Sequence, residues 1–173
     1  MKAYKYTGVE FHHTREDVDT IACLVKQLPA NAICVNIGSR FGTSTMAMLE
    51  ARDDIFIFSV DVNVCDDETI NLTEEGLYQQ HRLVRVLGRS QDAGLNFPIS
   101  VDFVFVDGAH DYRSVRNDIT VWWEKLKAGG IMALDDYGSS ILCPWVKPAV
   151  DDLFTEDSFC LVGDIIAFRK DVE

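Results

Sequence analysis

The chain has 173 residues, a length that suits one domain with a single substantial core. Hydrophobic residues make up 47% and charged residues 25% of it, which argues against disorder. The formal net charge of −12 repels phosphate backbones, so we expect no nucleic-acid partner. This composition is compatible with a globular domain that binds metal ions or small molecules.

The cysteines are scattered singly along the chain, without a CxxC pair. They are Cys23, Cys34, Cys65, Cys143 and Cys160. We expect buried free thiols in a reducing compartment, and the spacing disfavours a zinc site. No signal-peptide core is visible at the N-terminus, and no apolar run approaches the roughly 20 residues that span a membrane. The sequence therefore predicts a cytoplasmic protein without a membrane partner.

The first predicted element is an amphipathic helix in residues 13–29. Thr14 and Asp17 have the spacing of a capping box, and apolar residues then recur at helical spacing until Pro29. His13 lies just before this helix. We interpret it as a surface residue, and we give His12 and His81 the same interpretation.

Short apolar runs then alternate with helix-forming stretches. The predicted strands are 32–38, 55–62, 83–88, 101–107 and 131–138. The predicted helices are 43–52 with Thr43 as N-cap, 112–130 with Trp122 in the core and Gly129–Gly130 as its stop, and a short one within 146–154. Residues 63–82 are polar and predict a loop with a helical turn or two.

The chain ends in a predicted hairpin over residues 158–170, with its turn at Gly163–Asp164. Five alternating units followed by a hairpin predict an α/β fold. We expect a Rossmann-like three-layer sandwich, with a mostly parallel seven-stranded sheet and a C-terminal antiparallel hairpin. No repeat or linker is visible, so we expect residues 1–173 to form a single domain, with 1–30 as an N-terminal helical segment.

Ligands of such sheets bind at the carboxyl ends of the strands, where two features stand out. Gly38 and Gly42 bracket the turn after the first strand, where glycine permits close approach of the backbone and a helix N-terminus offers free N–H groups. Asp61 follows the second strand and can accept hydrogen bonds from ribose hydroxyls. The turn lacks the middle glycine of GxGxxG, but the two features together indicate an adenosine-type cofactor.

Carboxylates also end the fourth and fifth predicted strands. If those strands are neighbours, Asp107 and the pair Asp135–Asp136 can converge on one cation, provided that the chain turns at the pair. Oxygen donors of this kind indicate a hard ion, most simply Mg²⁺. His110, three residues after Asp107, could then remove the proton of a substrate hydroxyl. The alternative is that Asp107 caps a helix and that His110 is a surface residue.

The segments "VNIGSRFGTS", "FSVDV", "GRSQD", "FVDGAHDY" and "LKAGGIMALDDYG" occur in the order seen in class I S-adenosylmethionine-dependent methyltransferases. The chain resembles most the small-molecule O-methyltransferases of the macrocin O-methyltransferase type, which are metal-dependent. The resemblance implies that the Gly38–Gly42 turn holds the methionine part of the cofactor, Asp61 the ribose and the "GRSQD" turn the adenine. The cofactor-binding residues implied are Asn36, Gly38, Ser39, Arg40, Gly42, Ser44, Asp61, Val62, Ser90, Gln91 and Asp107.

Asn36 departs from the family pattern, which has Glu or Asp at this position. The amide keeps an acceptor but loses the charge that would pair with the ammonium group of the cofactor. This departure bears on the affinity for the cofactor and not on the fold.

The sequence thus predicts a methyltransferase domain that transfers a methyl group from S-adenosylmethionine to a hydroxyl of a small molecule, with Mg²⁺ and His110 assisting. Two alternatives remain open: a cofactor-binding protein without methyl transfer, and a nicotinamide-dependent oxidoreductase. The acceptor is a hydroxylated small molecule of undefined identity. A homo-oligomer, in which a neighbouring copy closes the pocket, also remains open.

Overall fold

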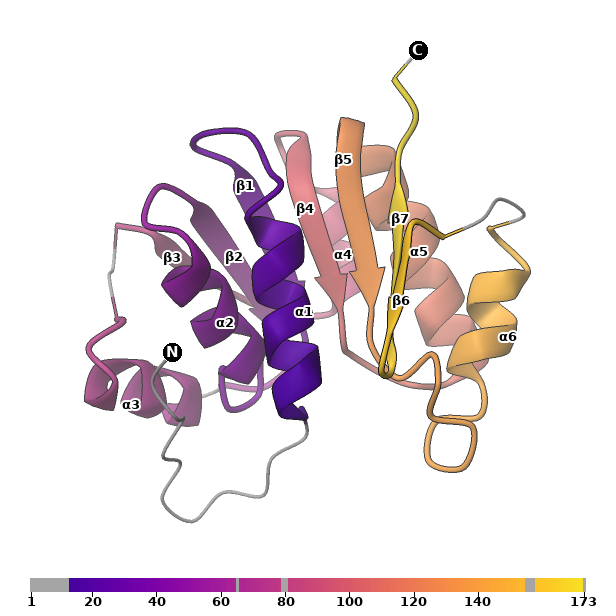
Figure 1. Cartoon of the computed structure of the whole chain (residues 1–173), viewed down its shortest axis with the longest axis horizontal. Coiled ribbons are helices and arrows are strands. Elements are labelled where there is room, and N and C mark those ends of the chain that lie inside the picture. Colours follow the sequence, from indigo (N-terminus) through magenta and orange to yellow (C-terminus); the bar gives the residue numbers. More distant parts are fainter. Residues whose placement is uncertain (1–12, 65, 79–80, 155–157, 173) are drawn as a thin grey trace.

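One sheet of seven strands forms the centre of the computed structural model, which describes residues 13–64, 66–78, 81–154 and 158–172 (Figure 1). The strands are β1 (Ile33–Ile37), β2 (Phe56–Asp61), β3 (Leu83–Leu87), β4 (Val101–Val106), β5 (Leu126–Leu134), β6 (Cys160–Val162) and β7 (Ile165–Arg169). Their order is β3-β2-β1-β4-β5-β7-β6. β1 to β5 run parallel, and β7 is antiparallel to both β5 and β6. The predicted sheet and hairpin are confirmed.

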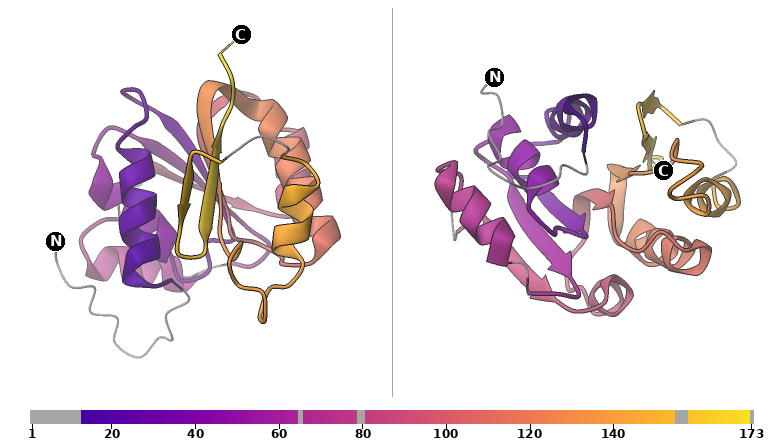
Figure 2. Two further views of the ribbon diagram at one scale, coloured as in Figure 1. Left: turned by 45° about the vertical axis from the view of Figure 1, so that its right-hand side comes forward. Right: turned by 90° about the horizontal axis from the view of Figure 1, so that it is seen from below.

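Helices cover both faces of this sheet, which makes three layers (Figure 2). They are α1 (Arg15–Val25), α2 (Thr43–Ala51), α3 (Asp66–Glu74), α4 (Ser90–Leu95), α5 (Tyr112–Lys125) and α6 (Val146–Asp151). Two cores result. One lies between the sheet and α1, α2 and α3, and the other lies against α5 and α6 around the fully buried Trp122.

The order of strands reverses between β1 and β4, because the chain moves outward to β2 and β3 before it returns. Ile37 at the end of β1 pairs with Val60 of β2 and with Val106 of β4. The carboxyl ends of these three strands are therefore level, and the turns that follow them share one edge. Ligand sites of open α/β sheets lie at this switch point.

The start of α1 is fixed by the capping box that the sequence predicts. Thr14 Oγ1 accepts a hydrogen bond from the Asp17 backbone N–H, and the Asp17 carboxylate accepts one from the Thr14 backbone N–H at 2.7 Å. The reciprocal pair satisfies N–H groups that a helix start leaves free. It also fixes the chain direction immediately after His13.

Two predicted boundaries are wrong. The N-cap of α2 is Gly42 in the left-handed region (φ 84°), and Thr43 is already inside the helix. Gly129–Gly130 does not stop α5, because β5 begins directly at Leu126 and the two glycines pair with Lys170 near the chain end. A register shift between Val101 and Phe103 absorbs the extra residues. The "GRSQD" turn also contains the start of a short helix, α4, which the sequence pattern does not predict.

The described cysteines, Cys23, Cys34, Cys143 and Cys160, are all free thiols. Of these, only Cys34 is buried, so the expectation of buried thiols is wrong for the exposed Cys23 and the half-buried Cys143 and Cys160. Cys65 lies outside the described residues, as do residues 1–12 of the predicted N-terminal segment. Within the described part of the chain, no helix is both long enough and apolar enough to cross a membrane.

Candidate active site

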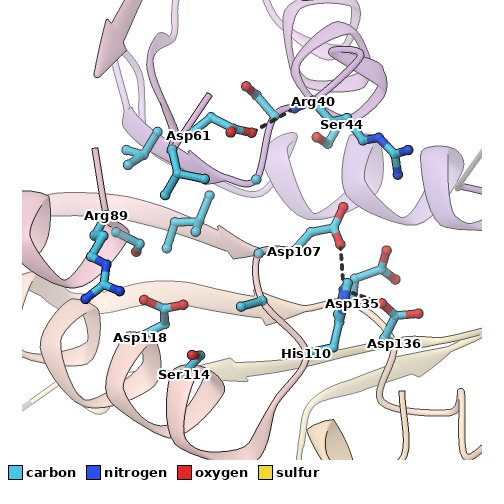
Figure 3. A pocket seen from close by; sticks show the side chains of 18 of the residues that line it. Arg40, Ser44, Asp61, Arg89, Asp107, His110, Ser114, Asp118, Asp135 and Asp136 are labelled. Atoms are coloured by element: carbon cyan, nitrogen blue, oxygen red, sulfur yellow. Dashed lines mark hydrogen bonds and ion pairs between the residues drawn. The ribbon is translucent and has the colours of Figure 1, made fainter. Parts of the chain in front are cut away.

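A cavity of about 1080 Å³ opens at the carboxyl edge of the sheet. Its walls are the turns after β1 to β5 and the first turns of α5. The sequence-predicted residues that line it are Gly38, Ser39, Arg40, Ser44, Asp61, Val62, Ser90, Gln91, Asp107, His110, Asp135 and Asp136. Asn36 and Gly42 do not line it. Figure 3 shows that Arg40 and Asp61 lie on one side of this cavity and that His110, Asp135 and Asp136 lie on the other.

The turn between β1 and α2 has a backbone that few sequences can adopt. Gly38, Arg40 and Gly42 all have positive φ, of 81°, 41° and 84°. No side chain caps α2, whose first residues Thr43 and Ser44 line the cavity. Free N–H groups at a helix N-terminus attract a carboxylate or a phosphate.

Asp61 ends β2 and is held in place by two backbone hydrogen bonds. Its Oδ2 accepts the Arg40 N–H at 3.2 Å and its Oδ1 accepts the Asn63 N–H at 2.8 Å. The first of these bonds joins the glycine turn to the end of β2 (Figure 3). The carboxylate keeps free lone pairs on the cavity side, so it can accept hydrogen bonds from a ligand.

Asn36 is fully buried and is not available to a ligand. Its Nδ2 donates to Ser44 Oγ and to Thr45 Oγ1, each at 2.9 Å. Thr45 in turn donates to Glu68 of α3 at 2.6 Å, and Glu68 is paired with Arg85 at 2.9 Å. The position that carries an acid in the resembled family thus belongs to a buried polar network behind the cavity. Its predicted contact with a cofactor is not supported by this geometry.

The other end of the cavity contains an acid that is not among the predicted site residues. Asp118 of α5 is buried and accepts a hydrogen bond from Gln91 Nε2 at 2.7 Å. Burial raises the pKa of Asp118 to about 6, although hydrogen bonds from Ser90 and Gln91 oppose this. Ser90 also accepts the Trp122 indole N–H at 2.8 Å. The signal was an aspartate on the apolar face of a helix, next to Ile119 and Trp122.

Asp107 follows β4 and Asp135 follows β5, as the sequence predicts. Their backbones continue the ladder: the Asp107 N–H donates to Ile37 O at 3.0 Å and the Asp135 N–H to Val106 O at 3.0 Å. Burial is the main cause that raises the pKa of Asp107, and the nearby charge of Asp135 acts in the same direction. Two carboxylates in one largely buried place repel each other unless a positive group lies between them.

Asp136 has φ 60°, so the chain turns between the two adjacent acids. His110 Nε2 lies 2.8 Å from Asp136 Oδ2 and 3.6 Å from Asp107 Oδ1 (Figure 3). These contacts with Asp107 and Asp136 raise the pKa of His110 to about 10, against the effect of its partial burial. His110 thus bridges the ends of β4 and β5 as a cation.

His13 is the positive group that faces Asp135, and its interpretation as a surface residue is wrong. Its side chain is 5% exposed, and Nε2 lies 3.1 Å from Asp135 Oδ2 and 3.4 Å from Asp107 Oδ2. Burial would lower the pKa of His13, but the contact with Asp135 and the charges of Asp107, Asp135 and Asp17 raise it to about 9. His81, in contrast, is exposed as expected.

Residues 35–137 match the model of a family described as a methyltransferase domain. This match covers more than half of the chain, and the chain belongs to that family. It is also similar, at 34% identity over 59 residues, to the uncharacterized protein R132 of Acanthamoeba polyphaga mimivirus. That similarity covers 34% of this chain and spans only about a quarter of the curated relative's length (27%).

Among solved structures, the O-methyltransferase TomG of Streptomyces achromogenes in complex with SAM has a TM-score of 0.72 at 18% identity, over 91% of this chain and 81% of TomG. A putative O-methyltransferase of Klebsiella pneumoniae has a TM-score of 0.74 at 16% identity, over 94% of this chain and 84% of its own. At these identities the likeness establishes the fold, which is that of Rossmann-like methyltransferases.

Proposed function

We propose that this chain transfers the methyl group of S-adenosylmethionine to a hydroxyl of a small molecule, with a divalent cation and His110 assisting. The observation that carries the proposal is the sharing of one cavity. The glycine turn with Asp61 and the group formed by Asp107, His110 and Asp136 line the same space. A methyl donor held by the first would have the second in front of it.

The residues present fit the cofactor. The uncapped N-terminus of α2 would receive its carboxylate, and Asp61 would accept the ribose hydroxyls. Ser90, Gln91 and the buried Asp118 offer polar groups to an adenine edge. A nicotinamide dinucleotide fits less well, because the side chain of Arg40 stands where the dinucleotide fingerprint has its middle glycine.

The donors also fit a divalent cation. Asp107, Asp135 and Asp136 end adjacent strands, and carboxylate oxygens suit Mg²⁺ and Mn²⁺. Such a cation, when bound, orients a substrate hydroxyl and makes it more acidic. A cation bound to these carboxylates would also neutralise the negative charges around His110.

His110 is the residue that we expect to accept the hydroxyl proton at Nε2. Beside uncompensated Asp107 and Asp136 its pKa is about 10, and an imidazolium is not a base. The action of His110 as a base therefore depends on the cation. His110 becomes a proton acceptor when another positive charge neutralises Asp107 and Asp136. Positioning of the two reactants contributes the rest of the rate acceleration, since the sulfonium already activates the methyl group.

The acceptor side of the cavity contains Leu142 and Cys143, from the loop after β5. Leu142 is 84% exposed, which gives this rim an apolar contact for a carbon skeleton next to the polar group at Asp136. We infer a small hydroxylated acceptor that is partly apolar. The free thiols of the described residues agree with a reducing, cytoplasmic location.

Calorimetric titration tests the first step. S-adenosylmethionine and, separately, NAD are titrated into the purified protein, each with Mg²⁺ and with EDTA. We expect S-adenosylmethionine alone to bind. Asp61→Asn should weaken its binding by about tenfold or more through the lost charge-assisted hydrogen bonds. Asp171→Asn, an exposed change of the same charge, is the control. Binding of NAD alone would overturn the proposal.

Transfer is tested by formation of S-adenosylhomocysteine with a panel of phenols, sugars and hydroxylated polyketides. We expect turnover with at least one acceptor in Mg²⁺ or Mn²⁺, and loss of turnover in EDTA. Cofactor binding with no turnover on any hydroxyl, but turnover on amines or thiols, would contradict the hydroxyl assignment.

A further inference from the structure

His13 contains a buried nitrogen atom without a hydrogen-bond partner. The imidazole Nε2 is buried. Among the described residues, it is the one buried side-chain nitrogen or oxygen atom that has no hydrogen-bond partner. It lies 3.1 Å from Asp135 Oδ2, but the geometry of the contact is not that of a hydrogen bond. A buried polar atom of this kind costs about 1 to 3 kcal/mol unless it is satisfied in another way.

The distances around this atom are those between ligands of one metal ion. One ligand atom each from His13, Asp107 and Asp135 lie within 4.8 Å of one another. Metal–ligand bonds of about 2.1 Å at right angles place neighbouring ligand atoms about 3 Å apart. The separations from His13 Nε2 are 3.1 and 3.4 Å. An ion between the three atoms would displace the proton of Nε2, bind the freed lone pair and take over the role of the imidazolium in offsetting both carboxylates.

The fold holds the imidazole firmly in this position. Thr14, the next residue, is fixed by the capping box of α1. The His13 ring packs against Phe105 of β4, with ring centroids 5.9 Å apart. Asp107 is two residues beyond Phe105 and Asp135 ends the adjacent strand. Three separate segments of the chain therefore meet at Nε2, and none of them is a free surface loop.

We infer that His13 is a metal ligand together with Asp107 and Asp135, and that this site prefers Mn²⁺ or a similar transition-metal ion to Mg²⁺. Imidazole nitrogen binds ions of the Mn²⁺ to Zn²⁺ series, whereas Mg²⁺ favours oxygen ligands and water. The inference rests on the proposed function in one respect, since both place a cation at Asp107 and Asp135. It adds an imidazole nitrogen to the carboxylates predicted for this site.

A second group, formed by His110, Asp136 and Cys143, does not carry the same argument. His110 is 43% exposed there and makes a close ion pair with Asp136 at 2.8 Å. Its nitrogen is satisfied, and solvent reaches it. The ion pair explains that arrangement without a metal.

Pulsed electron paramagnetic resonance of bound Mn²⁺ tests the inference without any turnover. The protein is stripped with EDTA, desalted and loaded with Mn²⁺, and the imidazole ¹⁴N coupling is recorded. The chain has four histidines, so the triple variant His12→Gln, His81→Gln, His110→Gln keeps only His13. We expect the ¹⁴N coupling in the unaltered protein and in this triple variant, and its loss in His13→Gln.

Affinity gives a second readout. His13→Gln should weaken Mn²⁺ binding by about tenfold or more and Mg²⁺ binding by less, because only the nitrogen ligand is lost. His81→Gln, which removes an exposed imidazole outside the cavity, should change neither. Circular dichroism and a thermal melt in EDTA check that His13→Gln folds. If it does not fold, the triple variant still decides the question.

Absence of ¹⁴N coupling in the triple variant, its persistence in folded His13→Gln, or no binding of Mn²⁺ by the unaltered protein would each overturn the inference. These results are separate from the fate of the proposed function. A ¹⁴N-coupled ion in a protein that does not bind S-adenosylmethionine supports the metal site and removes the methyltransferase. Methyl transfer supported by an ion without ¹⁴N coupling supports the methyltransferase and removes His13 as a metal ligand.

Discussion

Gly38 and Asp107 are in backbone contact where the order of the strands reverses. A Cβ atom at position 38 would lie 1.8 Å from the Asp107 carbonyl oxygen, and Gly38 has φ 81°. The turn that we assign to the cofactor and the carboxylate that we assign to the cation therefore touch through their main chains. A shift of one must move the other.

Gly38→Ala should accordingly damage both parts of the site. The left-handed backbone costs about 1 to 2 kcal/mol for a residue with a Cβ, and the overlap with Asp107 adds about 1 to 3 kcal/mol more. Thermal melts and titration with S-adenosylmethionine measure the two effects. Gly76→Ala is the matched control, since Gly76 has φ 70° and open space around it. Equal losses in the two variants would show that the contact with Asp107 does not matter.

Asn36→Asp should destabilise the protein without improving cofactor affinity. The new carboxylate would be fully buried, and its Oδ atoms would face Ser44 and Thr45 in a network that already holds Glu68. An uncompensated buried charge of this kind costs about 3 to 5 kcal/mol. Urea denaturation at pH 7 gives the loss, and Asn96→Asp, at an exposed position, provides the comparison. A gain in affinity for S-adenosylmethionine would show that position 36 does face the ligand.

The sequence predicts the elements of this fold well, because the central strands β1 and β4 are short apolar runs buried on both faces. β4, for example, is buried along its whole length. Prediction from the sequence fails where pairing between distant segments decides the structure. Gly129 and Gly130 indicate the end of a helix locally, yet hydrogen bonds with Lys170 extend β5 through them. No pattern within ten residues contains that information.

The residues of the candidate site also divide into those that the sequence predicts and those that it does not. Asp61, Asp107 and Asp135 could be predicted because acids at strand ends must meet at one edge of a parallel sheet. His13 could not, since a capping box fixes where a helix begins but not what the preceding residue faces. The surroundings of Asn36 and Asp118 could not be predicted for a related reason. Periodicity predicts that a position is buried, but it does not predict whether a buried polar side chain meets a ligand or the protein.

His110→Gln separates catalysis from binding. Glutamine retains hydrogen-bonding capacity near Asp136 but cannot accept a proton at neutral pH, so kcat should fall by about 10²- to 10⁴-fold. Titration should give an S-adenosylmethionine affinity close to that of the unaltered protein, because His110 lies on the side of the cavity opposite Asp61 (Figure 3). Arg116→Gln, a change on the partly exposed ion pair with Asp152, controls for a general effect of lost charge. Unchanged kcat in His110→Gln would remove it from the mechanism.

Asp118 gives the stability of the cofactor-free protein a pH dependence of defined sign. Its pKa is raised from 3.8 to about 6, so the folded state binds a proton that the unfolded chain has already lost. The stabilisation is complete below pH 4 and is lost as the pH rises to about 6, after which the buried charge remains as a penalty. Asp118→Asn keeps an acceptor for Gln91 and removes this charge, so it should raise the free energy of unfolding at pH 7 by about 1 to 3 kcal/mol. Urea denaturation of both proteins from pH 4 to pH 8 measures this difference, which should be small at pH 4 and grow to its full size by pH 7. A difference that is independent of pH would show that Asp118 has an ordinary pKa in the folded protein.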